Sequence, residues 1–152
     1  MRDRKIAIIG GGNLGSAIAE GLIKSKFVSP QQITITRRNT DALEHLRVMG
    51  VNVSNDNASA IRNSNVIIVA LKPYNVRDVL GGLKESFNAS QHMIISVVTG
   101  IYLEDLSAIV DHGVPIFRAM PNRAIAIQES VTCLCQSNAD SEQVKYVTEL
   151  FD

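Results

Sequence analysis

The chain has 152 residues, of which 15 are Lys or Arg and 15 are Asp or Glu, so its formal net charge is zero with neutral histidines. Apolar residues make up 45% and charged residues 20% of the chain, which is typical of a globular domain with one sizeable core and excludes a disordered chain. The lack of a basic excess argues against a nucleic-acid partner, because phosphate neutralisation needs one.

Membrane and secretory segments are not expected. The longest apolar run, residues 66–71, is too short to span a bilayer, and the apolar stretch after the basic N-terminus is too short for a secretory signal. Two cysteines do not make a disulfide framework. We therefore expect a cytoplasmic protein without a membrane partner.

The N-terminal part alternates between strand-like and helix-like segments. Residues 5–9 are apolar and end in three glycines, and the spacing of Leu14, Ile18 and Leu22 predicts a helix directly after them. Residues 33–36 are all β-branched, which predicts a second strand.

The next segments continue this alternation. A helix capped by Asn39, Thr40 or Asp41 is expected to end before Gly50 and to lead into a brief strand at residues 51–53. The later elements are expected to be strands at 66–71, 93–98, 116–117 and 131–135, and helices after Pro73, over 103–110 and from a cap at Ser141 to Phe151.

Residues 10–15 match the pattern G-x-G-x-x-G. The match follows a strand and opens a helix, which is the context that dinucleotide binding requires. Gly10 permits a tight turn, Gly12 lets the backbone approach a pyrophosphate, and Gly15 lets the helix pack close to the strand. A glycine-rich turn that merely connects the two elements is the alternative.

The alternation and the glycine turn together predict the fold class. We expect an α/β fold with a Rossmann-like, doubly wound and mostly parallel sheet that carries helices on both faces. Residues 1–152 are expected to form a single NAD(P)-binding domain of this kind.

The residues after the second strand predict the cofactor. An NAD-binding site usually has an acid there that binds the ribose 2′-hydroxyl, whereas this chain has Thr36, Arg37, Arg38 and Asn39. Two guanidinium groups are suited to bind a 2′-phosphate, so NADP(H) is preferred over NAD(H). The alternative is a pair of solvated arginines on a surface loop.

Four stretches, residues 8–18, 69–73, 95–101 and 118–122, occur in an order that resembles the N-terminal domain of pyrroline-5-carboxylate reductases. The resemblance implies reduction of 1-pyrroline-5-carboxylate, a small-molecule imine, to L-proline with NAD(P)H in proline biosynthesis. By matched position it assigns the following residues to cofactor binding: Gly10, Gly12, Asn13, Leu14, Gly15, Thr36, Arg37, Arg38, Asn57, Ala70, Leu71, Lys72, Pro73, Val98, Thr99, Met120, Pro121 and Asn122. The candidates next to the substrate are Met120, Pro121, Asn122 and Arg123, and no catalytic residue is assigned.

Two departures from the family keep other functions open. The family usually continues the last stretch with Thr-Pro, whereas this chain has Arg123 and Ala124, which leaves a reductase of a different imine or carbonyl as an alternative. The family's C-terminal helical domain, which forms the dimer, is absent from residues 1–152. A non-catalytic NADP-binding module is therefore a second alternative, and a homo-oligomer is expected only if such a domain exists.

No metal site is expected. Cys133 and Cys135 lie in a strand-like segment, and His45, His92 and His112 are scattered, so the chain lacks the ligand spacing of a metal site. We expect these side chains to be ordinary core or surface residues.

Overall fold

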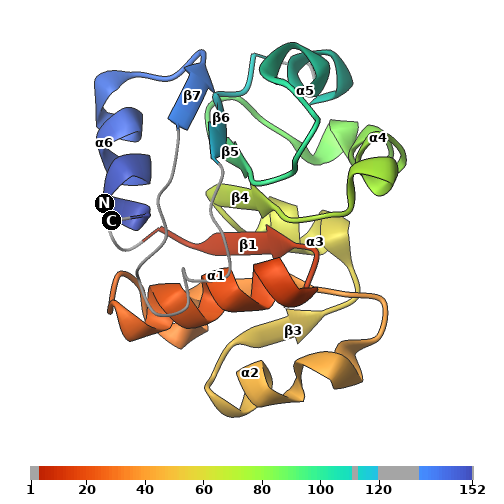
Figure 1. Ribbon diagram of the computed structural model, residues 1–152, viewed down its shortest axis with the longest axis vertical. Helices are drawn as coiled ribbons and strands as arrows, with labels where there is room; N and C mark the ends of the chain where they lie inside the picture. The colour runs from red at the N-terminus through yellow and green to blue at the C-terminus, as the bar shows by residue number, and fades with distance from the viewer. Residues whose placement is uncertain (1–3, 111–112, 120–133, 152) are drawn as a thin grey trace.

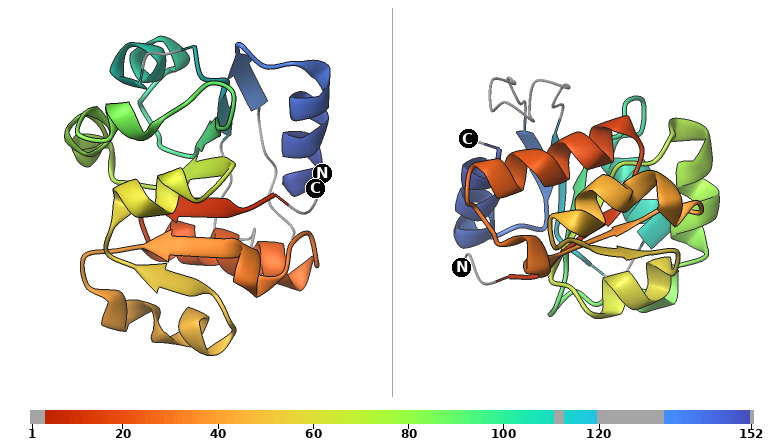
Figure 2. Two further views of the ribbon diagram at one scale, coloured as in Figure 1. Left: turned by 180° about the vertical axis from the view of Figure 1, so that it is seen from behind. Right: turned by 90° about the horizontal axis from the view of Figure 1, so that it is seen from below.

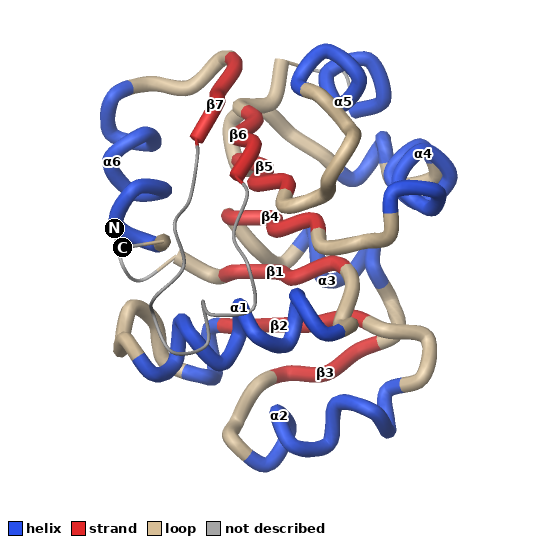
Figure 3. Tube along the Cα trace, viewed as in Figure 1, coloured by secondary structure: helices blue, strands red, loops and turns tan. Residues whose placement is uncertain are grey.

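The computed structural model describes residues 4–110, 113–119 and 134–151, and its centre is one seven-stranded sheet. The strands are β1 (Ile6–Ile9), β2 (Ile33–Thr36), β3 (Asn52–Ser54), β4 (Val66–Val69), β5 (Met93–Ser96), β6 (Ile116–Ala119) and β7 (Leu134–Ser137). Their order in the sheet is β3-β2-β1-β4-β5-β6-β7 (Figure 3). The first six strands are parallel, and β7 runs antiparallel to β6.

Helices cover both faces of the sheet (Figures 1 and 2). They are α1 (Asn13–Lys24), α2 (Glu44–Val48), α3 (Asn57–Arg62), α4 (Pro73–Gly81), α5 (Leu103–Val110) and α6 (Ser141–Leu150), with short 3-10 helices η1 (Pro30–Gln32), η2 (Thr40–Leu43) and η3 (Lys84–Ser86). Buried side chains of α1, α2 and α6 share one apolar cluster, and those of α3, α4 and α5 share the other. The predicted Rossmann-like, doubly wound fold is thus confirmed.

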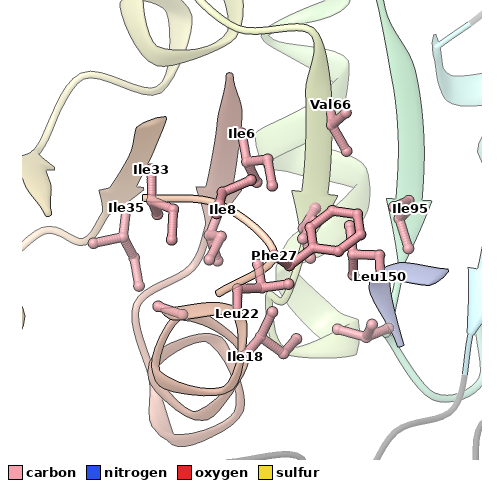
Figure 4. Packing of buried hydrophobic residues seen from close by; sticks show 14 of the residues in the cluster. Ile6, Ile8, Ile18, Leu22, Phe27, Ile33, Ile35, Val66, Ile95 and Leu150 are labelled. Atoms are coloured by element: carbon pink, nitrogen blue, oxygen red, sulfur yellow. The ribbon is translucent and has the colours of Figure 1, made fainter. Parts of the chain in front are cut away.

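The central strand β1 contributes to both apolar clusters. Ile6 and Ile8 pack on the face that α1 covers, together with Ile18 and Leu22 of that helix (Figure 4). The alternate residues of β1 belong to the opposite cluster, and all four are fully buried. A continuous apolar strand is what burial on both faces requires.

The strand order reverses beside β1. Ile6 pairs with Ile33 of β2 on one side and with Val66 of β4 on the other, so the chain leaves β1 in one direction and later returns to its opposite edge. The connections that follow β1 and β4 consequently diverge, and such a switch point leaves a crevice at the carboxyl ends of the strands.

Several element boundaries differ from those expected. Asp140, and not Ser141, caps α6: its carboxylate accepts the Gln143 amide at 2.8 Å, and the Gln143 side chain accepts the Asp140 amide at 3.0 Å. This reciprocal pair is a capping box, which a carboxylate and a glutamine three residues later form readily. Earlier in the chain, Asn39 is the cap of η2, because its side chain accepts the Asp41 amide.

The third strand and the helix after it also differ from expectation. Strand β3 covers Asn52–Ser54, one residue later than expected, and α3 was not expected at all. Helix α3 has only six residues and buries only Ala60 and Ile61. Its N-cap is Asp56, whose carboxylate accepts the Ser59 amide at 3.1 Å.

His92 is buried beneath α3, and its hydrogen bonds select one tautomer of the neutral ring. Its Nδ1 accepts the Asn88 amide at 3.0 Å, so its Nε2 carries the proton that is donated to the Ile61 carbonyl at 2.8 Å. Burial lowers the pKa of His92, and the Ile61 hydrogen bond offsets this only in part. The folded chain then binds this proton more weakly than the unfolded chain. The contribution of His92 to the stability is therefore fully present above pH 6.5 and is lost as the pH falls below it.

We therefore expect the free energy of unfolding to decrease below pH 6.5, by at most about 1.4 kcal/mol per pH unit for this one group. Urea unfolding between about pH 5 and pH 8 measures the slope, which His92→Gln should flatten. The matched control is His45→Gln, since the His45 side chain is 52% exposed. An unchanged slope in His92→Gln would contradict the assignment.

Candidate functional site

A groove of about 470 Å³ lies at the carboxyl edge of the sheet, beside the switch point. Loops after β1, β2, β3 and β4 form its walls, and its lining residues are Gly10, Gly11, Gly12, Thr36, Arg37, Arg38, Asn39, Asn55, Asn57, Ala70, Leu71, Lys72, Asn75 and Val79. Among these described residues three are cations and none is Asp or Glu. The lining therefore favours an anionic ligand with several hydrogen-bonding groups.

The glycine turn between β1 and α1 forms one wall of the groove. Gly10 has a φ of +110°, and a β-carbon there would lie 2.6 Å from the Ala70 carbonyl oxygen. Only glycine fits this backbone conformation and this contact between the two loops. The turn thus lies directly against the end of β4.

Gly12 is the N-cap of α1 and faces open space. No described atom would lie within 4 Å of a β-carbon at this position, and no described side chain caps the helix. The first amides of a helix lack partners within the helix, and they carry the positive end of its dipole. The N-terminus of α1 is therefore accessible to an anion, as the glycine pattern predicts.

Gly15 allows α1 to pack against the turn. A β-carbon on Gly15 would lie 2.0 Å from the Gly10 carbonyl oxygen and 3.3 Å from the Ile8 side chain. Even the smallest side chain would push the helix away from β1. The three glycines of the pattern thus meet the three geometric requirements that were inferred from their spacing.

The end of β2 is hydrogen-bonded to the same turn. The Gly11 amide donates to the Thr36 carbonyl at 2.7 Å, and Arg37 Nη1 donates to the Gly11 carbonyl at 3.0 Å. Arg38 is exposed and lines the groove, as Arg37 does, but its side chain makes no hydrogen bond within the described residues. The two arginines, expected to act as a pair, therefore differ in their hydrogen bonds.

The other predicted cofactor residues fall into two groups. Asn57, Ala70, Leu71 and Lys72 line the groove with the residues already described. The remaining described candidates lie outside its lining, in the first turn of α1, at the start of α4 and after β5: Asn13, Leu14, Gly15, Pro73, Val98 and Thr99. Met120, Pro121, Asn122 and Arg123 lie outside the described residues.

Sequence reasoning missed five lining residues, namely Gly11, Asn39, Asn55, Asn75 and Val79. Asn39 and Asn55 follow the carboxyl ends of β2 and β3, so their position after a strand was the available signal. Asn75 and Val79 lie on the face of α4 that borders the groove, which no motif marked.

A second cavity, of about 330 Å³, lies at the opposite edge of the sheet. Its lining includes Arg4, Asn65 and His92, which precede β1, β4 and β5. Ligands of open α/β sheets bind at the carboxyl ends of the strands, so this cavity is at the wrong edge. The two nitrogens of His92 already have backbone partners there.

Metal-binding clusters and membrane-spanning helices are both absent from the described parts of the chain. Those residues contain no group of three or more His, Cys, Asp or Glu side chains that could hold a metal ion. None of their helices is long and apolar enough to cross a membrane.

The switch-point groove, the open helix N-terminus and the glycine turn define the class: this is a nicotinamide dinucleotide-binding domain of the Rossmann type. The family model described as "NADP oxidoreductase coenzyme F420-dependent" matches residues 5–100. The chain belongs to this family.

Curated relatives resemble nearly the whole chain. Pyrroline-5-carboxylate reductase 1 of Dictyostelium discoideum is 39% identical over 95% of this chain, and pyrroline-5-carboxylate reductase of Methanosarcina acetivorans is 33% identical over 99% of it. The matches cover 27% and 56% of those two proteins. The chain thus spans about half the length of these relatives or less.

A solved structure agrees with the sequence relatives. The crystal structure of Plasmodium falciparum pyrroline carboxylate reductase with NADP bound matches with a TM-score of 0.86 and 25% identity. The match covers 99% of this chain and 55% of that one. The resemblance inferred from four short stretches is confirmed.

Proposed function

We propose that residues 1–152 form the cofactor-binding part of a pyrroline-5-carboxylate reductase, which reduces the imine 1-pyrroline-5-carboxylate to L-proline with NADPH. The single observation that carries this proposal is the groove at the switch point, where an uncapped helix N-terminus meets three cations and, among the described residues, no acid. Relatives of that name along 95% or more of the chain support the choice of reaction.

The groove fits the diphosphate of a dinucleotide. Gly12 leaves space for a phosphate at the N-terminus of α1, and the amides of Asn13 and Leu14 in the first helical turn donate to it. Leu71 and Val79 supply apolar surface for a base, and Asn57 supplies amide groups beside them. A mixed lining of this kind is typical of cofactor sites.

Discrimination between the two cofactors is assigned to the loop after β2. It carries Arg37 and Arg38 and lacks the acid that would bind an unmodified ribose and repel a 2′-phosphate. NADP bound to the Plasmodium relative supports the same preference. We accordingly propose NADP(H) over NAD(H).

When bound, the dinucleotide would supply a hydride to the carbon of the imine bond, whose nitrogen takes up a proton. The chain's own contribution is position: α1 and the glycine turn hold the diphosphate, and the carboxyl ends of β4 and β5 direct Lys72, Val98 and Thr99 to the same edge of the sheet. Holding two reactants in the correct relative position and orientation is itself a large part of catalysis. Met120, Pro121, Asn122 and Arg123 are proposed to lie beside the substrate.

The proposal is tested by titrating the 152-residue chain with NADPH and NADH and by assaying turnover of 1-pyrroline-5-carboxylate. We expect NADPH to bind at least tenfold more tightly, since charged hydrogen bonds contribute about 1.5–3 kcal/mol each. NADPH oxidation that depends on the imine and matches proline formation supports the full proposal.

Other outcomes separate the alternatives. Tight NADPH binding without turnover would support the cofactor-binding part of the proposal and show that residues 1–152 alone act as a non-catalytic NADP-binding module. Turnover of other imines or carbonyls but not of 1-pyrroline-5-carboxylate would reassign the substrate, and a chain that binds neither dinucleotide would refute the cofactor site itself.

A further inference from the structure

We propose that Arg37 is a positioning residue for the diphosphate, which holds the glycine turn in its binding conformation, and that Arg38 alone reads the 2′-phosphate. This inference rests on the proposed cofactor site and assigns two different roles to neighbouring cations. Their sequence gives no basis for separating them, but their surroundings do.

Arg37 is one part of a two-bond clamp between β2 and the turn. The Gly11 amide donates to the Thr36 carbonyl at 2.7 Å, and the Gly11 carbonyl accepts Arg37 Nη1 at 3.0 Å, so both polar groups of Gly11 are bonded to the end of β2. The same carbonyl also accepts the Ser16 hydroxyl of α1, at the longer distance of 3.4 Å. The backbone of Arg37 is fixed as well, because its amide donates to the Ser54 carbonyl at 3.1 Å. The guanidinium group thus extends from an anchored backbone to the turn.

The clamp sets the orientation of the next amide. The Gly11 carbonyl and the Gly12 amide belong to one peptide plane, and no described peptide bond is cis, so the two groups point in opposite directions. By holding the carbonyl oxygen, Arg37 fixes the direction in which Gly12 N–H donates. A neutral hydrogen-bond donor would fix this direction too. A cation, however, also offsets the partial negative charge of the carbonyl oxygen near a bound diphosphate.

Packing adjacent to the clamp leaves Gly11 little freedom. A β-carbon on Gly11 would lie 2.8 Å from the Leu43 side chain and 3.1 Å from the Thr36 carbonyl oxygen. The turn is therefore enclosed on the side of β2 and open on the side of Gly12, where no described neighbour lies within 4 Å. Such an arrangement holds the amides in place before a ligand arrives, which reduces the ordering cost of binding.

Both arginines are exposed and line the groove, but their hydrogen bonds differ. The Arg37 side chain donates to the Gly11 carbonyl, whereas the Arg38 side chain makes no hydrogen bond or ion pair within the described residues. Its guanidinium group is available to a phosphate on the ribose, with which a planar fork pairs well. The preference for NADP(H) then depends on Arg38, and the affinity for either dinucleotide depends on Arg37.

The experiment compares Arg37→Ala and Arg38→Ala in the 152-residue chain by titration with NADPH and NADH. We expect Arg37→Ala to weaken both dinucleotides by a similar factor, roughly tenfold or more, so that the ratio of the two dissociation constants is kept. Arg38→Ala should weaken NADPH by roughly tenfold or more and leave NADH within about twofold, so that the ratio collapses. Arg37→Lys, which retains a charged donor, should recover part of the lost affinity.

Amide hydrogen exchange supplies a readout that needs no ligand. Because the clamp holds Gly11, its amide should exchange faster in Arg37→Ala and remain protected in Arg38→Ala. A selective loss of NADPH in Arg37→Ala, or an unchanged Gly11 exchange rate, would overturn the inference. If the unmodified chain binds neither dinucleotide, the cofactor proposal fails, and the exchange rate still decides whether Arg37 holds the turn.

Discussion

Replacing Gly12 with alanine is expected to weaken dinucleotide binding at least a hundredfold while leaving the fold intact. The added methyl group would occupy the space in which a diphosphate must approach the backbone at the N-terminus of α1. Losing two charged hydrogen bonds of about 1.5 kcal/mol each accounts for a factor of this size. Titration with NADPH measures the effect directly.

The stability of the Gly12→Ala chain separates this effect from misfolding. Gly12 has a φ of −77° and a ψ of −160°, which alanine adopts freely, and no described atom lies within 4 Å of the new β-carbon. The free energy of unfolding without ligand should therefore change by no more than about 1 kcal/mol, since alanine is a poorer N-cap but restricts the unfolded chain. Unimpaired NADPH binding would refute the placement of the diphosphate.

Replacing Gly15 with alanine should instead destabilise the chain, by on the order of 3 kcal/mol or more. Its β-carbon would lie 2.0 Å from the Gly10 carbonyl oxygen, and a backbone atom in a tight turn has little freedom to move away. For a domain of this size we expect the melting temperature to fall by about 10 °C. Thermal unfolding followed by circular dichroism measures it.

Gly81→Ala is the matched control for this substitution. Gly81 is also a helical glycine, at the end of α4, but a β-carbon there would have no described atom within 4 Å. Alanine there should be neutral or stabilise the chain by up to about 1 kcal/mol. Equal melting temperatures for Gly15→Ala and the unmodified chain would show that α1 does not pack on the turn as described.

Strong periodic patterns made the fold predictable from the sequence. Ile33–Thr36 coincides with β2, and the stripe of Leu14, Ile18 and Leu22 lies within α1. Short elements were less predictable, because they bury too few side chains to leave a pattern. Helix α3, with Ala60 and Ile61 as its buried residues, is the clearest example, and its boundary depends on a local hydrogen bond from Ser59 to Asp56.

The candidate site was predictable where backbone geometry dictates the residue type. Gly10, Gly12 and Gly15 each have the space or conformation that the motif requires. The different hydrogen bonding of Arg37 and Arg38 was not predictable, since sequence shows the charge of a side chain and not the carbonyl it contacts. Asn75 and Val79 joined the groove only through the orientation of α4.

The ladder between β1 and β4 has a consequence for assembly of the chain. Every other ladder within the described sheet joins strands that are consecutive in the sequence, whereas this one brings together segments such as Lys5 and Asn65, 60 residues apart. Folding must therefore close one long loop before the half with β1, β2 and β3 joins the half with β4 to β7 in a single sheet. The groove spans the boundary between these halves, with Gly10–Gly12 and Arg37 on one half and Ala70–Lys72 on the other. A nucleotide bound there would contact both halves, and it would therefore raise the free energy needed to separate them.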